Sequence, residues 1–385
     1  MPRNYYIGID VGTGSVRAGL VQDDGTLLAS STESTITWRD PNDHRIFEQS
    51  TNNIWDGMCK TIRAVLAEAK VAPSDVKGLG FDATCSLAVS DMNGDPVVVT
   101  KGDKLGEIGD RNIILWADHR AEEEANLING TGATVLDYVG GVMSLEMEIP
   151  KTLWLKKHMA PERFARCQFF DLPDFLTYKA TGDNTRSCCS VTCKCSFVPT
   201  KNGWQPDFFE KIGLGEFVGN NFKQLGAHES NVLTAGIPIG QGLSKKAAEE
   251  LGLLEGTPVG SGVIDARVCP TPLSERILRP VQSKEGVFVP GVWGPYKNAV
   301  MPGWWMNEGG QSSTGQLIDF MIRTHPAYPK LQELAEEQKT SIHEVLANQL
   351  NELCKEEGVA TWTELTKDMH FYPDLHGNRS PIADP

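Results

Sequence analysis

A glycine-rich turn between two apolar strands is the feature that most constrains the fold of this 385-residue chain. The strands are predicted at Tyr5–Ile9 and Val16–Gln22, and the turn between them contains Gly12 and Gly14. Because glycine has no side chain, phosphate oxygens could approach the backbone N–H groups of this turn closely. Asp10 follows the first strand, where its carboxylate could hold Mg²⁺ directly or through water. The segment therefore predicts a nucleotide-binding hairpin, with a plain β-hairpin as the alternative.

Two better-known phosphate-binding loops do not fit this turn. A P-loop carries Lys followed by Ser or Thr after a second glycine, and no such pair occurs here. This turn lacks the third glycine of the dinucleotide-binding fingerprint and has Arg17 in that region. A strand also follows the turn, where that motif needs a helix. The remaining pattern resembles the first phosphate loop of the actin-like ATPases, in which two related domains hold a nucleotide between paired hairpins.

The composition is that of a globular protein with room for two hydrophobic cores. Hydrophobic residues make up 40% of the chain and charged residues 22%. The net charge of −14 disfavours a nucleic acid or an anionic membrane as a partner. No stretch approaches the roughly 20 apolar residues of a membrane span, and the first strand begins too early for a secretory signal. We therefore expect a cytoplasmic protein with neither kind of partner.

Nine cysteines without a repeating framework are typical of reduced cytosolic thiols. Four of them lie close together, at Cys188, Cys189, Cys193 and Cys195. Their spacing is not that of two paired zinc knuckles. We predict that Ser187–Phe197 is a strand, in which alternate residues face opposite sides. A metal site at these thiols is the less favoured alternative.

The first 85 residues are predicted to form three strands, a helix and a further strand. Asp23-Asp24-Gly25 is a hairpin turn, and apolar residues at helical spacing predict a helix over 53–70. A strand is expected at Val76–Phe81, and this order is that of the ribonuclease-H-like unit of the actin-type fold. Further strands are expected at Asn112–Trp116 and Pro258–Ile264, and further helices at Ala121–Ile128, Leu243–Leu251 and Ile342–Cys354.

Four further segments, together with the opening turn, resemble the FGGY carbohydrate kinases. They are Trp116-Ala-Asp118-His-Arg120-Ala121, Glu148-Ile-Pro150-Lys151-Thr-Leu-Trp154, Gly262-Val-Ile-Asp265-Ala266 and Asp374-Leu-His376-Gly377-Asn378-Arg379. The closest resemblance is to the D-ribulokinase-like pentulose kinases of that family, and it covers Tyr5 to Ala266 and then Lys284 to Pro385. Thr152 departs mildly from the family, which usually carries an apolar residue there. Five matching segments in the family's order are a stronger signal than any one of them.

The resemblance implies an α/β fold of the actin-like ATPase (ribonuclease H-like) type, with two domains at 1–266 and 267–385 and the second incomplete. It implies ATP-dependent phosphorylation of a free pentulose, with D-ribulose as the favoured substrate, Mg²⁺ as the metal and a homodimer as the assembly compatible with the family. A catalytically impaired form, or a non-catalytic sugar- or nucleotide-binding protein on the same scaffold, is the alternative. An actin- or chaperone-like ATPase without a sugar site is disfavoured by Trp116–Arg120 and Pro150–Trp154.

Sugar phosphorylation needs a base near the reacting hydroxyl, groups that neutralise the transferring phosphoryl, and polar groups that fix the sugar. By resemblance Asp265 is the catalytic base, since it ends an apolar strand beside Gly260, Gly262 and Ala266. The structural alternative is a helix N-cap, a frequent role of Asp at such a junction.

The resemblance also assigns a nucleotide side and a sugar side to the site. The nucleotide-binding residues would be Asp10, Gly12, Thr13, Gly14, Ser15 and Arg17, with Asp10 also as the metal ligand. The sugar-binding residues would be Asp82, Thr84, Trp116, Asp118, Arg120, Lys194 and Glu308. Asp118 and Arg120 suit hydroxyl recognition because one accepts and the other donates hydrogen bonds. The alternatives are that Asp118 caps a helix and that Lys194 lies on a solvated strand face.

The stretch Arg267–Gln282 departs from the family. Its prolines at 270, 272 and 280 break any helix, and it contains no glycine, whereas relatives carry a helix, strands and a second phosphate loop there. The chain then ends at Pro385, soon after the Asp374 segment. Because phosphoryl transfer needs donors on both sides of the phosphates, we expect a truncated or alternatively spliced form, or a faulty gene model, that catalyses poorly or not at all.

Overall fold

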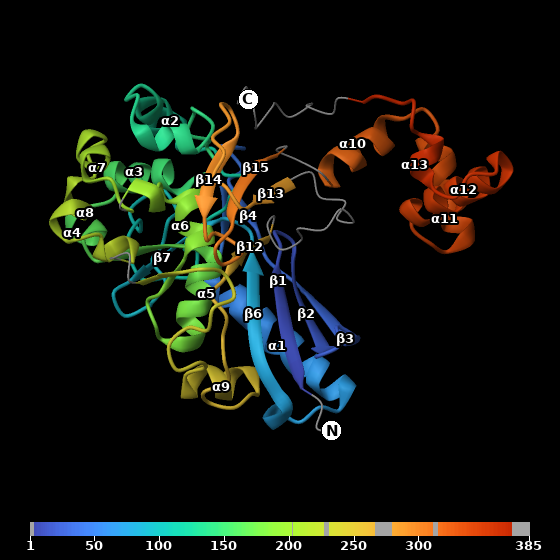
Figure 1. Cartoon of the computed structure of the whole chain (residues 1–385), viewed down its shortest axis with the longest axis horizontal. Helices are drawn as coiled ribbons and strands as arrows, with labels where there is room; N and C mark the ends of the chain where they lie inside the picture. Colours follow the sequence, from blue (N-terminus) through green and yellow to red (C-terminus); the bar gives the residue numbers. More distant parts are fainter. Residues whose placement is uncertain (1–3, 202, 227–230, 266–278, 311–314, 372–385) are drawn as a thin grey trace. The chain divides into compact units, whose positions relative to one another are not determined.

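The computed structural model describes residues 4–201, 203–226, 231–265, 279–310 and 315–371, which form two compact units (Figure 1). The first unit extends to Gly309 and the second begins at Gly310. Each is described by itself. Every predicted site residue that the structure describes belongs to the first unit.

A five-stranded sheet of order β12-β6-β1-β2-β3 begins the first unit. Its strands are β1 (Tyr5–Val11), β2 (Ser15–Gln22), β3 (Leu27–Ser34), β6 (Val76–Ala83) and β12 (Val263–Ile264). The first three form an antiparallel meander, and β6 and β12 run parallel to β1. The predicted order of three strands, a helix and a strand is confirmed, with two short strands inserted before the helix. The strand expected at Pro258–Ile264 is much shorter, and isolated bridges from Val259 to Leu79 and from Gly260 to Pro238 precede it.

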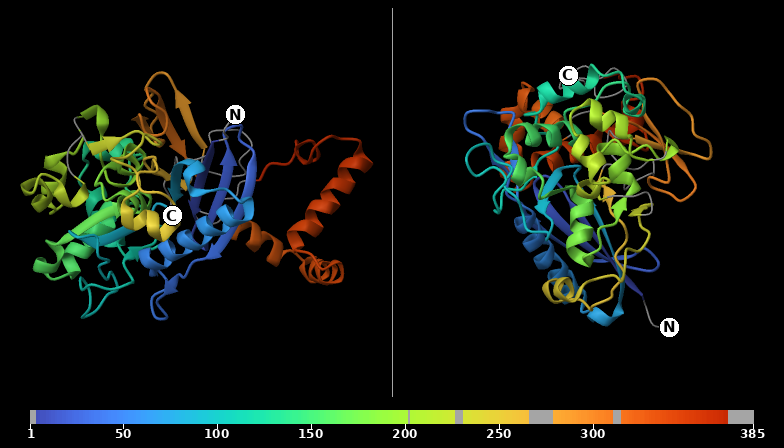
Figure 2. Two further views of the ribbon diagram at one scale, coloured as in Figure 1. Left: turned by 90° about the horizontal axis from the view of Figure 1, so that it is seen from below. Right: turned by 90° about the vertical axis from the view of Figure 1, so that its left-hand side faces the viewer.

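Three helices cover one face of this sheet: α1 (Thr51–Ala69), α5 (Leu172–Thr181) and α9 (Lys245–Leu251). Figure 2 shows these helices beside the sheet. Side chains alternate along a strand, so Ile7 and Ile9 join this core while Asp10 belongs to the opposite face. The Ser50 side chain accepts from the Asn53 N–H and so caps α1, the amphipathic helix that the sequence predicted. The packing of one face thereby leaves Asp10 on the other.

A second sheet of order β4-β5-β8-β7-β9 belongs to a larger hydrophobic core. Its strands are β4 (Trp38–Arg39), β5 (Phe47–Gln49), β7 (Leu87–Asp91), β8 (Ile113–Ile114) and β9 (Cys167–Asp171). The helices of this part are α2 (Glu122–Asn129), α3 (Glu148–His158), α4 (Pro161–Phe164), α6 (Cys188–Lys194), α7 (Pro206–Lys211) and α8 (Gly215–Gly219). Short 3₁₀ helices occur at Pro73–Asp75, Thr134–Tyr138, Pro199–Lys201 and Lys223–Leu225.

The strand predicted at Ser187–Phe197 is wrong. Only β10 (Arg186–Ser187) is extended, pairing in parallel with β11 (Val232–Leu233), and α6 follows at once. Ser187 caps α6 by accepting from the Cys189 N–H. Every residue of this short helix is buried, so the sequence shows neither a two-residue nor a helical polar period. The four clustered thiols belong to this buried helix and to Cys195 just after it.

A third, antiparallel sheet of order β13-β15-β14 completes the first unit. It consists of β13 (Arg279–Ser283), β14 (Trp293–Lys297) and β15 (Trp305–Gly309). Trp293, Tyr296 and Met306 belong to the larger core, and the Tyr296 hydroxyl donates to the Tyr138 carbonyl at 2.6 Å. This attachment brings Glu308 of β15 against the segments that precede residue 266.

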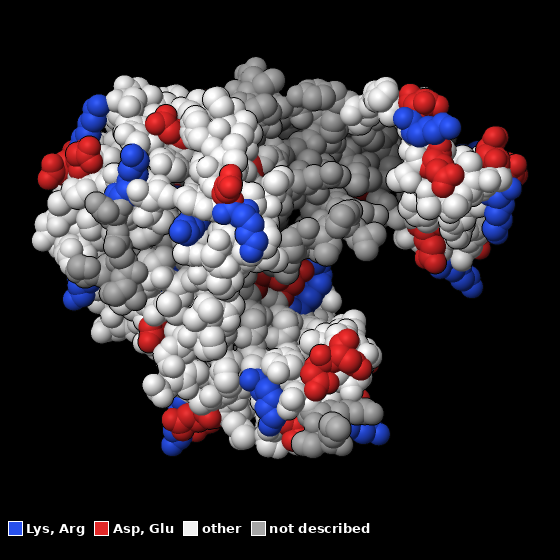
Figure 3. All heavy atoms as spheres, viewed as in Figure 1, with Lys and Arg blue, Asp and Glu red and all other residues white. Residues whose placement is uncertain are grey.

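The second unit is helical, with α10 (Gly315–Thr324), α11 (Tyr328–Gln338), α12 (Ile342–Glu357) and α13 (Trp362–Leu365). Leu331, Ala335 and Val345 form its small core, and Ser341 caps α12. The predicted helix at Ile342–Cys354 is confirmed. Across the described residues no helix has both the length and the apolarity to span a bilayer. On the face drawn in Figure 3, acidic and basic side chains are interspersed.

Candidate active site

Three of the predicted acidic residues lie at the carboxyl ends of adjacent strands in the first sheet. Asp10 on β1 is the register partner of Asp82 on β6, which in turn pairs with Val263 on β12. Partners in a ladder point to the same face, so Asp10 and Asp82 share the face that the helices leave uncovered. Asp265 follows β12 directly and is half-buried. The carboxyl ends of three adjacent parallel strands thus gather an acidic cluster from distant parts of the sequence.

The glycine turn between β1 and β2 is closed by a hydrogen bond from the Gly12 N–H to the Ser15 carbonyl at 2.9 Å. Neither Gly12 nor Gly14 has a positive φ. A Cβ at Gly14 would meet no atom within 4 Å, and one at Gly12 would meet only the Ser15 carbonyl, at 3.6 Å. Neither backbone conformation nor internal packing therefore requires glycine here. Open access to the backbone for a ligand is the remaining physical reason, and it fits a phosphate group.

Arg17 and Asp10 face one another across the hairpin. The Arg17 Nη1 donates to the Asp10 Oδ2 at 2.9 Å, and the two side chains are 55% and 27% exposed. A guanidinium can reach a phosphate, and a half-exposed carboxylate is the kind of ligand that Mg²⁺ uses together with water. Asp10 is thus the residue of this hairpin that could hold a metal ion accompanying a nucleotide.

The second sheet holds Thr13, the middle residue of the turn. The Gln49 Nε2 donates to the Thr13 carbonyl at 2.8 Å, and the Thr35 hydroxyl donates to the same oxygen at 2.9 Å. The Trp116 indole Nε1 donates to the Thr13 Oγ1 at 2.9 Å. A hydrogen bond therefore joins Thr13, which was predicted to bind the nucleotide, to Trp116, which was predicted to bind the sugar.

The Trp116 backbone is fixed by polar groups from two other segments. Its N–H donates to the Ser86 Oγ at 3.1 Å, and that hydroxyl lies 3.2 Å from the Thr84 hydroxyl. The Lys151 ammonium donates to the Leu115 carbonyl at 2.6 Å and to the Trp116 carbonyl at 3.1 Å. Lys151 is fully buried, and this desolvation lowers its pKa to about 8. The sequence pointed to Lys151 only as part of a motif; its contacts follow from tertiary packing.

Asp118 and Arg120 are buried and bonded to each other. The Arg120 guanidinium donates to both Asp118 oxygens, to the Glu48 Oε1 at 2.9 Å and to the Val99 carbonyl. Asp118 also accepts from the Phe47 N–H at 2.8 Å. Asp118 does not cap α2, whose N-cap has no side-chain hydrogen bond, so that alternative is wrong. The geometry favours a role in positioning the Trp116 loop over direct contact with a sugar.

Lys194 and Glu308 are brought together from segments far apart in the sequence. Lys194 ends α6 with its side chain 1% exposed, and its Nζ lies 4.0 Å from the Glu146 Oε2 and 5.1 Å from the centre of the Trp293 ring. The Cys193 Sγ, next to it, lies 3.8 Å from the Glu308 Oε2. The alternative of a solvated lysine is wrong, and Glu146 is a neighbour that sequence reasoning missed.

A second group of buried acidic residues was also missed by the sequence analysis. The Cys195 Sγ donates to the Glu148 Oε2 at 3.0 Å, and the Asp174 Oδ1 accepts from the Ser187 N–H at 2.8 Å. Desolvation raises the pKa of Asp171 to about 6 and that of Asp174 to about 8, and it raises the pKa of Glu148 well above its usual value. Such a cluster carries protons at neutral pH that exposed acids would have lost.

Some predictions lie outside the described residues. These are Ala266, the stretch Arg267–Gln282 up to residue 278, and the whole Asp374–Pro381 segment. The described residues resume at Arg279.

Known proteins match this chain along its length. Residues 5–269 match the FGGY family of carbohydrate kinases, N-terminal domain, and residues 277–385 match the C-terminal domain of that family. A human FGGY carbohydrate kinase domain-containing protein is 43% identical over 410 residues, covering 100% of this chain and 72% of the relative. A Saccharomyces cerevisiae D-ribulokinase is 41% identical over 422 residues, covering 99% of this chain and 58% of the relative.

Solved structures share the fold at low sequence identity. A xylulose kinase from Rhodospirillum rubrum superposes with a TM-score of 0.66 at 18% identity, covering 87% of this chain and 67% of that chain. A gluconate kinase from Lactobacillus acidophilus gives 0.67 at 15% identity, covering 99% and 70%. The predicted actin-like α/β fold is confirmed.

Proposed function

Because this chain belongs to the FGGY family of carbohydrate kinases, we propose that it transfers the terminal phosphoryl group of ATP to a hydroxyl of a free pentulose, with D-ribulose as the favoured substrate. The product would be D-ribulose 5-phosphate. The observation that carries this proposal is that Asp10, Asp82 and Asp265 lie at the carboxyl ends of three adjacent parallel strands. Beside them is a turn in which neither backbone conformation nor packing requires glycine. The 41% identity to the yeast D-ribulokinase supports the choice of sugar.

Asp265 is proposed as the general base. Its carboxylate would take the proton of the sugar's terminal hydroxyl while that oxygen bonds to the terminal phosphorus of ATP and the bond from phosphorus to ADP breaks. A divalent metal bound with the nucleotide would offset phosphate charge, and Asp10 is the residue proposed to hold it. The hairpin N–H groups and Arg17 would bind phosphate oxygens.

The sugar side is proposed to consist of buried polar groups that are shielded from water. Lys194 would donate to sugar oxygens, and Glu308 would accept from a sugar hydroxyl. Both side chains are almost fully buried, so their hydrogen bonds would be made in a medium of low dielectric constant. The half-buried Trp116 ring offers an apolar face for the sugar's carbon skeleton, and Asp82 and Thr84 would line the adjoining loop.

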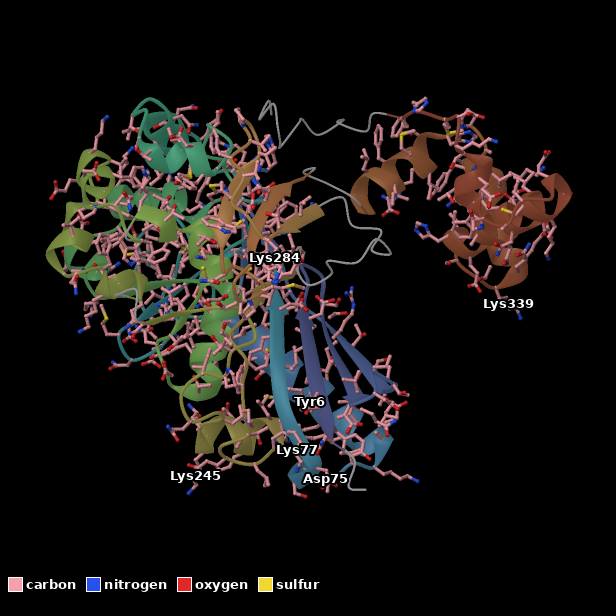
Figure 4. All side chains as sticks on the ribbon, viewed as in Figure 1. Tyr6, Asp75, Lys77, Lys245, Lys284 and Lys339 are labelled. Atoms are coloured by element: carbon pink, nitrogen blue, oxygen red, sulfur yellow. The ribbon has the colours of Figure 1, made fainter. Side chains whose placement is uncertain are left out.

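A coupled assay of ADP release tests the proposal with D-ribulose, L-ribulose, D-xylulose, ribitol and glycerol. We expect slow turnover that depends on the sugar and is fastest with D-ribulose, because the stretch Arg267–Gln282 departs from the family. Asp265→Asn should lower kcat by about 10² to 10⁴, the usual contribution of a general base. Asp75→Asn is the matched control, because Asp75 is exposed and precedes β6 at the opposite end of that strand from Asp82 (Figure 4). ADP release without any sugar, or an unaffected Asp265→Asn variant, would contradict the proposal.

Binding without turnover is a distinct outcome of the same experiment. If calorimetry finds pentulose binding while no ADP is released, the chain acts as a sugar-binding protein on a kinase scaffold. A homodimer and a cytoplasmic location are further proposals. Light scattering of the purified protein tests the first, and cell fractionation tests the second.

A further inference from the structure

Trp116 joins three segments of the proposed active site. Its indole N–H bonds to Thr13 in the phosphate hairpin, its backbone N–H bonds to Ser86 in the loop that follows β6, and its carbonyl accepts from Lys151 of α3. The first segment belongs to the nucleotide side and the second to the sugar side. Trp116 as a residue is half-buried, so part of it remains accessible to a ligand.

We propose that Trp116 is a positioning residue that couples the two substrates: a sugar packed against its ring holds the indole in place, and the indole holds Thr13 and with it the phosphate hairpin. This inference rests on the proposed function, since it takes the sugar and the nucleotide to bind on either side of Trp116.

The residues on either side of Thr13 explain why the hydrogen bond to Trp116 would affect nucleotide binding. Gly12 and Gly14 lie on either side of it, and glycine loses more conformational freedom on ordering than any other residue. A hairpin that is fixed before the nucleotide arrives binds it at a lower entropic cost. A bound sugar should therefore tighten nucleotide binding, and by thermodynamic linkage a bound nucleotide should tighten sugar binding by the same factor.

Lys151 makes the link stiff. Its ammonium bonds to the carbonyls of two consecutive residues, Leu115 and Trp116, from inside a fully buried position. The backbone beneath the indole is thus held while the side chain spans to Thr13. A tryptophan on a loosely held loop could not transmit a restraint from its ring to its partner.

The Thr13 carbonyl has its own anchors, which separates coupling from folding. Gln49 and Thr35 both donate to that oxygen, independently of the indole. Losing the indole bond therefore leaves the hairpin backbone attached to the second sheet. Two changes break the bond. Thr13→Val keeps the shape of the side chain without the hydroxyl, and Trp116→Phe keeps an aromatic ring but loses the N–H together with part of the indole.

The test is a binding cycle. Calorimetry measures the Kd of ADP with Mg²⁺, with and without saturating D-ribulose, in the wild type, both single variants and the double variant. In the wild type we expect the sugar to tighten ADP binding about 5- to 150-fold, the usual range of coupling between sites. Trp116→Phe, Thr13→Val and the double variant should all bring this ratio close to one.

Thr35→Val is the matched control, because it removes a different hydrogen bond to the same turn. It should weaken ADP binding equally with and without sugar, so that the ratio is kept. A ratio that survives in Trp116→Phe, or a double variant that loses the sum of the two single losses, would overturn the proposal.

Amide hydrogen exchange of the ligand-free protein separates this inference from the proposed substrate. If no pentulose binds, the proposed function is wrong, and exchange then decides on the link. Faster exchange at residues 13–16 in both Trp116→Phe and Thr13→Val supports a positioning role for the indole. Unchanged exchange at these amides overturns it.

Discussion

The two sides of the proposed active site treat electric charge in opposite ways. In the phosphate hairpin Arg17 and Asp10 are 55% and 27% exposed, whereas across the site Lys194 and Glu146 are 1% and 5% exposed. Exposed pairs gain little energy, because water screens them and their side chains remain free to reorient. Buried charges must be paired, since leaving one alone costs several kcal/mol. The side chains of the hairpin can therefore rearrange around a ligand that carries its own charge. The polar groups of the sugar side are already fixed before a ligand binds.

This difference suits the two proposed substrates, a nucleotide and a pentulose. A nucleotide carries several negative charges and comes with a metal, so its site gains from exposed groups that can rearrange. A pentulose is uncharged and is told apart from its isomers only by the direction of its hydroxyls. Fixed polar groups in a dry pocket make that distinction sharply, because an isomer leaves a buried group unpaired.

The largest predicted effect concerns the buried network under the Trp116 loop. Arg120→Met would leave Asp118 without its guanidinium partner, and would leave Glu48 with the Thr100 hydroxyl at 2.6 Å and Arg111 at 2.7 Å. We expect the free energy of unfolding to fall by about 3–5 kcal/mol, the usual cost of breaking a buried ion pair. Urea denaturation measures it. A loss below about 1 kcal/mol would mean that this network behaves like a surface pair, and the contrast between the two regions would fail.

The next prediction concerns Glu308 on the proposed sugar side. Glu308→Gln should raise the KM for the pentulose about 10- to 100-fold, because a hydrogen bond to a buried charged group contributes about 1.5–3 kcal/mol. The KM for ATP should change little. Steady-state kinetics of both substrates give the answer, with Glu285→Gln as the control, since Glu285 is exposed just after β13. Equal rises in both KM values would place Glu308 outside the sugar side.

Much of the first sheet follows from local sequence patterns. The glycine turn fixes β1 and β2 as a hairpin, and the apolar spacing of α1 needs no knowledge of the rest of the fold. The acidic cluster could also be anticipated, because Asp10, Asp82 and Asp265 each follow an apolar run. Parallel strands then bring their ends to one edge.

Burial on every side hides the rest of the site. Helix α6 was predicted as a strand because each of its residues is buried, which removes the polar period that separates the two structures. Glu146 and Gln49 were missed because their partners lie in segments that meet only in the folded protein. The position of Lys151 within the motif Glu148–Trp154 was the one signal that the sequence offered for its role.

A third prediction concerns the buried acidic residues Glu148, Asp171 and Asp174. The pKa of Asp174 is raised to about 8 by desolvation, with Arg186 as the opposing charge and Asp171 adding to the rise. The folded protein therefore binds a proton that the unfolded chain has released, and stability falls as the pH rises towards 8. The decline should reach at most about 1.4 kcal/mol per pH unit for one such group.

Chemical denaturation between pH 5 and 8.5 measures this slope. Asp174→Asn should flatten it, because the amide stays neutral while its oxygen can still accept from the Ser187 N–H. Asp207→Asn is the control, as Asp207 is exposed in the first turn of α7. A stability that rises with pH over this range would contradict the raised pKa.

The smallest effect on stability is expected at the hairpin. Arg17→Met should change the free energy of unfolding by less than about 1 kcal/mol, because the pair with Asp10 is exposed. The KM for ATP should nevertheless rise several-fold, and the difference from the wild type should shrink as salt is added, since screening weakens an exposed charge on a phosphate. Lys77→Met is the control, an exposed cation near the amino end of β6 (Figure 4). An Arg17→Met variant destabilised as strongly as Arg120→Met would show that exposure does not divide the two sides of the site.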